Sequence, residues 1–176
     1  SEARGTYGKL LFSDDLMAPD FLAKTVPFLE HDDVGFVFSS VVIGSEPFKG
    51  DIKCPFTRQS GIFPSDRFIS MSLFNGDLPV SPGAALFRLD DLRKNLLLDI
   101  PSPSITGFVN HGAGLDLLIY LLTAAHYPNI AYVYEPLSYF HAHEGSISIS
   151  MKYAELARNY RQARLWFAEH YLGKKW

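Results

Sequence analysis

The fold is set near the start of the chain by Gly8-Lys9-Leu10-Leu11-Phe12-Ser13-Asp14-Asp15, an apolar run closed by two carboxylates. The run from Gly8 to Phe12 predicts a short buried strand. Pro19 suits the first position of a helix that ends near residue 30, and a second strand follows over residues 34–43. The core face of this helix is expected to hold Leu22, Val26 and Leu29. Strand, helix and strand in this order predict an α/β fold.

The later elements are less regular. From Gly44 to Asp77 no clean period emerges, so we expect loops and short turns there. The pattern then predicts a short helix over residues 89–94, an apolar helix over 117–125 and a strand over 130–134. The tail from Tyr153 to Tyr171 predicts an amphipathic helix. We expect its outward face to carry Arg158, Arg161 and Arg164.

Length and composition limit the classes of protein to consider. The 176 residues fit one α/β domain over 1–150 with a helix over 151–176 packed on it. The net charge of −3 argues against nucleic acid as a partner. One cysteine, Cys54, allows no internal disulfide and fits a reducing compartment. Because no apolar run approaches the roughly 20 residues that span a bilayer, we expect no transmembrane segment. We expect a cytoplasmic protein, with peripheral contact at the inner face of the membrane as a variant.

The paired carboxylates Asp14 and Asp15 follow the first predicted strand directly. Carboxylate oxygens at the rim of a sheet are ligands that Mg²⁺ or Mn²⁺ prefers, and such an ion can hold a substrate phosphate. A purely structural alternative is that the two residues cap the turn before the helix, because Asp side chains bond nearby backbone donors. Both interpretations remain open on spacing alone.

Two further groups add to this pattern. His141 and His143 lie two residues apart, so both face one side of an extended segment. Asp116 stands at the start of the apolar helix. Together with the Asp pair, they form the parts of a metal-dependent transfer site. The alternatives are exposed strand histidines and a helix-capping carboxylate. By the same reasoning Arg88 is a surface or ion-paired residue unless a phosphate lies nearby.

The order of these motifs resembles a family 2 glycosyltransferase of GT-A fold. The resemblance is carried by residues 8–22, which match the strand, acidic motif and Pro-led helix of that family, and by the strand that follows. Residues 81–88 look like the acceptor-side strand, and Gly114-Leu115-Asp116 is similar to the acidic motif that supplies the base. Residues 135–146 resemble the closing segment with its histidine.

The resemblance implies a partial GT-A sheet flanked by helices. It also implies inverting transfer from a nucleotide-diphospho-sugar to a hydroxyl of a glycan or lipid-linked acceptor, as in polysaccharide biosynthesis. Asp14, with Asp15 or His143, would contact Mg²⁺ or Mn²⁺, and Asp116 would be the catalytic base. Substrate contacts are implied for Gly83, Arg88 and His141.

The chain departs from that family in ways that leave alternatives open. Phe12-Ser13-Asp14 stands where the family has Asp-x-Asp, and His141 stands where it usually has Arg. The half of the fold that holds the nucleotide base is not in this sequence, so we expect a fragment of a longer enzyme. A non-catalytic binding or assembly module is one alternative, and a metal-dependent phosphoesterase using the Asp and His pairs is another. An open sheet edge would also favour self-association into a homo-oligomer.

Overall fold

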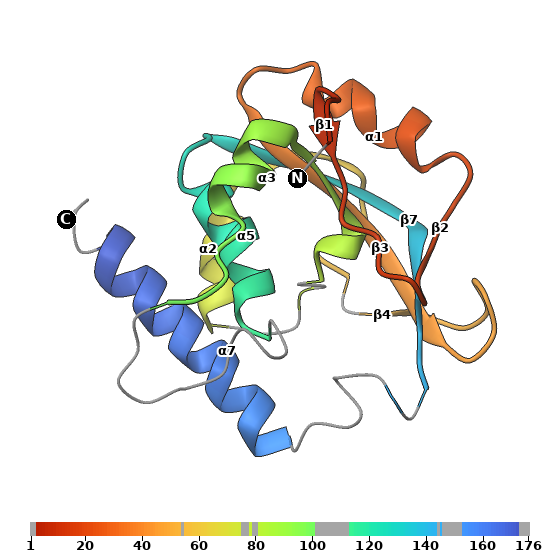
Figure 1. Cartoon of the computed structure of the whole chain (residues 1–176). Coiled ribbons are helices and arrows are strands. Elements are labelled where there is room, and N and C mark those ends of the chain that lie inside the picture. The colour runs from red at the N-terminus through yellow and green to blue at the C-terminus, as the bar shows by residue number, and fades with distance from the viewer. Residues whose placement is uncertain are drawn as a thin grey trace.

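In the computed structural model, the described residues are 3–53, 55–74, 78, 81–100, 113–143, 145 and 153–172. Within them one curled, seven-stranded sheet runs in the order β1-β6-β3-β7-β2, with β4 beside β3 and β5 beside β7 (Figure 1). The strands are β1 (Tyr7–Gly8), β2 (Leu16–Met17), β3 (Val34–Gly44), β4 (Ile52–Lys53), β5 (Gly61–Pro64), β6 (Ala85–Arg88) and β7 (Asn129–His141). Only β3 and β7 pair in parallel; every other pair of these strands is antiparallel.

The parallel pair of β3 and β7 forms the centre of the sheet. The expected strand over residues 34–43 is confirmed as β3, which is buried from Val34 to Val42. The expected strand over residues 130–134 is the first part of β7, which continues through Pro136 to His141. Register shifts in β3 around Ser40 lie opposite this proline. Such irregularities let a strand tolerate a residue that has no N–H to donate.

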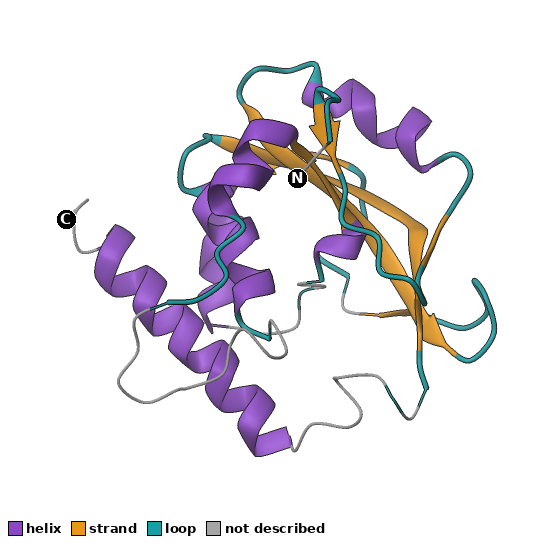
Figure 2. Cartoon of the chain, viewed as in Figure 1, coloured by secondary structure: helices purple, strands orange, loops and turns teal. Residues whose placement is uncertain are grey.

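Helices cover both faces of the sheet (Figure 2). The helices are α1 (Phe21–Leu29), α2 (Ser65–Phe74), α3 (Leu89–Asn95), α5 (Leu115–Ala124) and α7 (Tyr153–Phe167), with a 3-10 turn η1 (Pro82–Ala84) before β6 and a π-helical turn η2 (Ala168–Leu172) after α7. Phe36 and Phe38 of β3 face a large core shared with α2, α3, α5 and α7. Val37 faces a smaller core with α1 on the other side. The alternation along β3 therefore separates two hydrophobic clusters.

The first predicted strand is mostly wrong. Only its first residue, Gly8, lies in a strand, β1 (Tyr7–Gly8), and Leu11 and Phe12 are each 50% exposed. The N–H of Asp15 donates to the Phe12 carbonyl at 3.2 Å, so a turn over residues 12–15 follows this segment. An apolar run becomes a strand only where another strand pairs with it, and within the described residues none pairs with residues 10–12.

The first helix begins two residues later than expected. Asp20 occupies its N-cap and Phe21 its first turn, so Pro19 precedes the helix. Its buried residues are Phe21, Thr25 and Leu29, whereas Leu22 is 47% exposed. Leu29 is buried as predicted, but in the first two turns the buried positions are Phe21 and Thr25, each one residue before the predicted Leu22 and Val26.

Regular structure also lies where loops were expected between residues 44 and 77. This segment contains β4, β5 and α2. In α2 the buried side is shared by apolar residues and serines, namely Ser65, Phe68, Ile69 and Ser72. Polar residues on a buried face hide the apolar period from a sequence reading.

The three remaining helix predictions agree with the structure in their positions. They correspond to α3, α5 and α7. One outward assignment on α7 fails, because the Arg164 Nε donates to the Ser72 carbonyl at 2.7 Å. Among the described residues no helix is long and apolar enough to cross a membrane.

Candidate functional site

The acidic pair lies on the turn between β1 and β2, next to the end of β7. Asp14 Oδ2 and His143 Nε2 are 2.9 Å apart, and their side chains are about 40% exposed. The hydrogen bond from His143 lowers the pKa of Asp14 below its ordinary value. Residues 129 positions apart therefore meet at the surface, with one oxygen and one nitrogen donor side by side.

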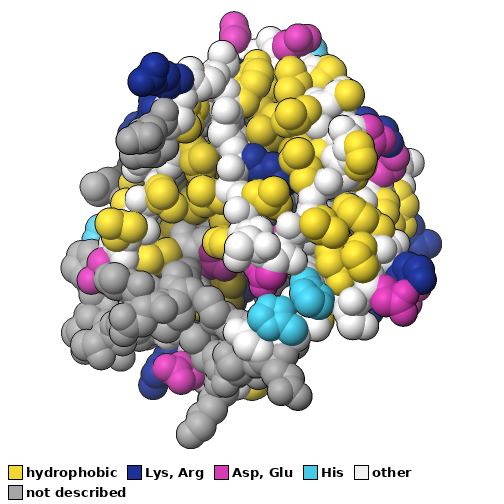
Figure 3. Space-filling model, turned by 45° about the vertical axis from the view of Figure 1, so that its right-hand side comes forward, with side chains coloured by type: hydrophobic (Ala, Val, Ile, Leu, Met, Phe, Trp, Pro, Cys, Tyr) yellow, Lys and Arg dark blue, Asp and Glu magenta, His cyan; other side chains and the backbone are white. Residues whose placement is uncertain are grey.

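Asp15 turns the other way, into the protein. The His141 N–H donates to Asp15 Oδ1 at 3.3 Å, and burial raises the pKa of this carboxyl. The rings of His141 and His143 lie with centres 5.2 Å apart, so the expected common side of the two histidines is observed. Figure 3 shows two histidine side chains together with acidic side chains next to them. We call Asp14, Asp15, His141 and His143 the acidic corner.

Gly83 lies against this corner. A methyl group at Gly83 would meet the Phe140 ring at 3.1 Å, Ser81 Oγ at 3.3 Å and Asp15 Oδ2 at 3.6 Å. Its carbonyl accepts from Ser138 Oγ at 3.1 Å and from the Lys9 Nζ. The structure thus places η1 directly beside the acidic pair.

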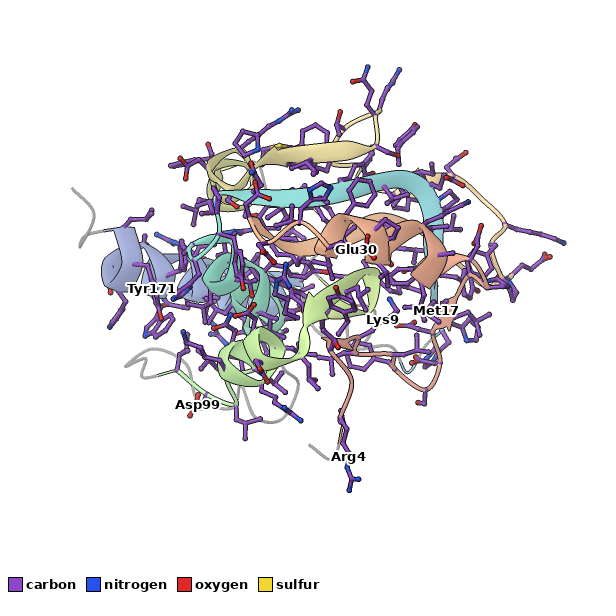
Figure 4. The ribbon with its side chains drawn as sticks, turned by 90° about the horizontal axis from the view of Figure 1, so that it is seen from above. Arg4, Lys9, Met17, Glu30, Asp99 and Tyr171 are labelled. Carbon is purple, nitrogen blue, oxygen red and sulfur yellow. The ribbon has the colours of Figure 1, made fainter. Side chains whose placement is uncertain are left out.

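Lys9 is a residue of this site that the sequence interpretation missed. Its Nζ lies 3.9 Å from the centre of the Phe21 ring, and burial lowers the pKa of Lys9 to about 7 despite the opposing charge of Asp15. Figure 4 labels this lysine on the segment that follows β1. A charged residue inside an apolar run before two carboxylates was the available signal.

The second carboxylate group of the site is Asp116, in the first turn of α5. Its Oδ1 accepts from the N–H groups of Gly114 and Leu117, both at 2.8 Å. Gly114 has φ 99°, a left-handed conformation that favours glycine. The other oxygen of Asp116, Oδ2, accepts from the Tyr160 hydroxyl of α7 at 2.6 Å. Burial raises the pKa of Asp116 to about 6, although these hydrogen bonds oppose the shift.

A chain of contacts connects Asp116 to the acidic corner. Tyr120, one turn further along α5, donates from its hydroxyl to the Ser81 carbonyl at 2.7 Å. Ser81 Oγ accepts from the Gly83 N–H at 3.3 Å, and Gly83 lies beside Asp15. The turn η1 therefore lies between the two carboxylate groups and is bonded or packed to both.

Arg88 is placed elsewhere. Its guanidinium donates to the carbonyls of Leu29 and His31 at 2.9 Å and of Val34 at 3.4 Å, around the C-terminal end of α1. These bonds satisfy carbonyls that a helix end leaves free. Substrate contact by Arg88 stays a prediction from the resemblance, and nothing in these contacts adds to it. The closing residues 144 and 146 and the loop 101–111 lie outside the described residues.

The donors of the acidic corner fit part of the shell of a small divalent cation. Among the described residues no group of three or more His, Cys, Asp or Glu side chains is arranged to hold an ion by itself. Mg²⁺ is commonly bound by one or two carboxylates, with substrate phosphates and water completing the shell. Asp14 and His143 offer that smaller number of protein ligands.

Comparison with known proteins gives structural matches and no sequence-level ones. No family model matches the chain, and no curated protein does so. The similar solved structures include S. aureus TarS 1–349 in complex with UDP-GlcNAc, with 14% identity, coverage of 95% of this chain and 44% of that chain, and a TM-score of 0.60. The structure of the same protein with UDP has 13% identity, coverage of 96% of this chain and 48% of that chain, and a TM-score of 0.54. The structure without a stated ligand has 11% identity, coverage of 96% and 49%, and a TM-score of 0.55.

These matches establish the fold. The chain has a glycosyltransferase-like α/β fold, in which a curled sheet is flanked by helices, and the fold expected from the sequence is confirmed. The chain spans a little under half the length of the TarS structures that it matches.

Proposed function

We propose that this chain carries the diphosphate- and acceptor-side residues of an inverting glycosyl transfer site of the family 2 type. The observation that carries the proposal is the contact between Asp14 and His143 across 129 residues, at the position where the resemblance expects a cation. The fold supports it, because the similar TarS structures contain UDP-GlcNAc or UDP. The donor proposed for this chain is accordingly a nucleotide-diphospho-sugar.

The acidic corner would hold Mg²⁺ or Mn²⁺ through Asp14 and His143, with Asp15 behind them. Bound there, the ion would supply charge stabilisation of the departing diphosphate, an effect of several kcal/mol in metal-assisted reactions. The lowered pKa of Asp14 keeps its carboxylate charged at neutral pH, as a cation ligand requires. Lys9 fixes the Gly83 carbonyl behind the corner, which holds η1 in place.

Asp116 would act as the general base. As the acceptor oxygen attacks the anomeric carbon, its proton passes to Asp116 Oδ2 and the bond from that carbon to the diphosphate breaks. Attack from the face opposite the leaving group inverts the configuration. With its pKa at about 6, Asp116 is ionised at pH 7 but still basic enough to take a proton. General base assistance contributes roughly 10²–10⁴-fold to such rates.

Two other functions compete with this one. A non-catalytic binding or assembly module would bind the donor without transferring the sugar, or would not bind the donor. A metal-dependent phosphoesterase would hydrolyse a simple phosphoester. The phosphoesterase is less favoured because the described donors number fewer than a self-sufficient metal site needs.

The direct test is calorimetric titration of the chain with UDP-GlcNAc, with and without Mn²⁺. We expect binding that requires Mn²⁺ and is weakened by about tenfold to a hundredfold in Asp14→Asn. The matched control is Asp32→Asn, an exposed carboxylate just beyond the far end of α1. Binding that ignores both Mn²⁺ and Asp14 would contradict the cation role. Hydrolysis of p-nitrophenyl phosphate by the same sample would favour the phosphoesterase instead.

A further inference from the structure

The carboxylate of Asp116 has one oxygen already committed. Its Oδ1 accepts two backbone N–H groups, at 2.8 Å each. A proton from an acceptor must therefore arrive at Oδ2, which has one lone pair on the Tyr160 hydroxyl and one remaining. The residue that sets the direction of this oxygen belongs to a different helix and lies 44 positions away.

Tyr160 is itself held firmly on α7. Arg164, one turn later, lies 6.0 Å from the centre of its ring and is anchored by its bond to the Ser72 carbonyl. Ala163 and Phe167 of the same helix are buried in the large core beside α5. The hydroxyl of Tyr160 is thus carried by a packed helix, so its contact with Asp116 is not a chance surface encounter.

The phenol of Tyr160 is a donor at every working pH. Burial and the neighbouring Asp116 raise the pKa of Tyr160 far above its ordinary value. Among the residues that the structure describes, the other titratable groups facing the pair are Tyr120 on α5, whose pKa burial also raises, and Arg164 on α7. A permanent donor favours the charged form of the carboxylate that accepts from it.

We propose that Tyr160 is a positioning residue for Asp116, aiming Oδ2 at the acceptor hydroxyl and holding the carboxylate in its charged form. This inference rests on the proposed function, since it assigns Tyr160 a role through the base. It adds α7 to the site: without the Tyr160 hydroxyl, only backbone N–H groups would oppose the effect of burial on the pKa of Asp116. The resemblance that identified Asp116 does not extend to this helix.

The test is a pH titration of the aspartate carboxyl carbons by NMR in the full chain and in Tyr160→Phe. Asp116→Asn identifies the Asp116 signal. We expect Tyr160→Phe to raise the titration midpoint of Asp116 by about one pH unit, the effect of losing one hydrogen bond to a charged group. The matched control is Tyr153→Phe on the same helix, whose ring is 85% exposed; its midpoint should equal that of the unaltered chain.

A second variant moves the midpoint in the opposite direction. With 3-fluorotyrosine at position 160 the shape is kept and the more acidic hydroxyl donates more strongly, so the Asp116 midpoint should fall. This variant also serves if Tyr160→Phe does not fold. An unchanged midpoint in a folded Tyr160 variant overturns the inference.

Kinetics separate this inference from the proposed function. Where sugar transfer is measured, the acidic limb of kcat/KM against pH should move with the NMR midpoint in Tyr160→Phe. A limb that stays in place while the midpoint moves overturns the positioning role. Failure of the proposed function would be seen differently, as absence of Mn²⁺-dependent UDP-GlcNAc binding in the unaltered chain.

Discussion

The acidic corner and the Asp116–Tyr160 pair are both built around carboxylates, yet they differ in almost every physical respect. Asp14 and His143 are about 40% exposed and lie 2.9 Å apart, and the His143 ring also lies beside that of His141. Asp116 accepts three hydrogen bonds from α5, its preceding glycine and α7. The pKa of Asp14 is lowered and that of Asp116 is raised. The first group is partly exposed to solvent, whereas the second is enclosed and held by hydrogen bonds from three directions.

The contrast shows that one small sheet can position two carboxylates whose pKa values are shifted in opposite directions. Hydrogen bonding to His143 lowers the pKa of the exposed carboxylate, and burial raises the pKa of the enclosed one. The turn η1 joins the two regions through Tyr120, Ser81 and Gly83. Breaking either region should therefore give a distinct signature.

The largest expected effect is on transfer, in Asp116→Asn. Transfer should fall by about 10²–10⁴-fold because the amide cannot take the proton. UDP-GlcNAc binding with Mn²⁺ should be unchanged, since the acidic corner is intact. Initial rates with a radiolabelled donor measure the transfer, and calorimetry measures the binding of UDP-GlcNAc.

Asp66→Asn is the control for that substitution. Asp66 also lies in the first turn of a helix, α2, so the same change is made at an equivalent helical position. Its rate should match that of the unaltered chain. Equal rates for Asp116→Asn and Asp66→Asn would remove Asp116 from the mechanism.

The next effect is a pH-dependent loss of stability that comes from Asp116. The unfolded carboxyl loses its proton near pH 3.8 and the folded one near pH 6. Between these values the folded state binds more protons, so raising the pH lowers the free energy of unfolding. The loss reaches up to about 3 kcal/mol and is complete above pH 6. Asp14, with its lowered pKa, acts with the opposite sign.

Urea unfolding at pH 4 and pH 7 isolates this contribution when the unaltered chain is compared with Asp116→Asn. Relative to the variant, the unaltered chain should lose stability over this interval. A parallel pH dependence in the two proteins would show that the carboxyl is not perturbed by burial.

A smaller effect is expected at the acidic corner. Asp14→Asn and His143→Ala should each weaken Mn²⁺-dependent donor binding by about tenfold to a hundredfold, the effect of one interaction with a charged group. If both residues serve one ion, the double variant should be little weaker than the worse single variant. Additive losses in calorimetry would mean that the two side chains act separately.

The smallest effect concerns Gly83. An alanine there meets Phe140 at 3.1 Å and Ser81 Oγ at 3.3 Å, so Gly83→Ala should lower the free energy of unfolding by about 1 kcal/mol. Gly44→Ala is the control, because the nearest atom to its added methyl is 3.5 Å away. Thermal unfolding measures the midpoint temperatures of the two variants and of the unaltered chain. Equal midpoints would mean that η1 accommodates the methyl without cost.

The parts of the fold that sequence predicted well are those with an uninterrupted pattern. The run that became β3 is apolar on both sides because both faces of the sheet are covered, and the apolar helix α5 is buried nearly all round. Residues 10–12 carry the same kind of pattern but form no strand, because the pattern cannot reveal that none of the described strands pairs with them. In α2 the reverse occurs: a helix forms although its buried serines interrupt the apolar pattern that would have predicted it.

The site shows the same division. The two histidines were expected on one side, and their rings are indeed adjacent. That His143 reaches Asp14, and that α7 reaches Asp116, depends on folding over 129 and 44 residues, which no local spacing encodes. In the sequence Tyr160 fits the apolar period of the last helix, and nothing in that period indicates a partner for its hydroxyl.

The cation role of the acidic corner is tested most directly by locating Mn²⁺ on the chain by NMR with UDP present. Addition of Mn²⁺ to the labelled protein broadens NMR signals near the ion. We predict that the signals of Asp14, Asp15, His141 and His143 broaden first and that those of α1 around Leu29 do not. In Asp14→Asn the same broadening should need a roughly tenfold to hundredfold higher Mn²⁺ concentration. Broadening centred elsewhere, or unchanged by Asp14→Asn, would contradict the cation role of the acidic corner.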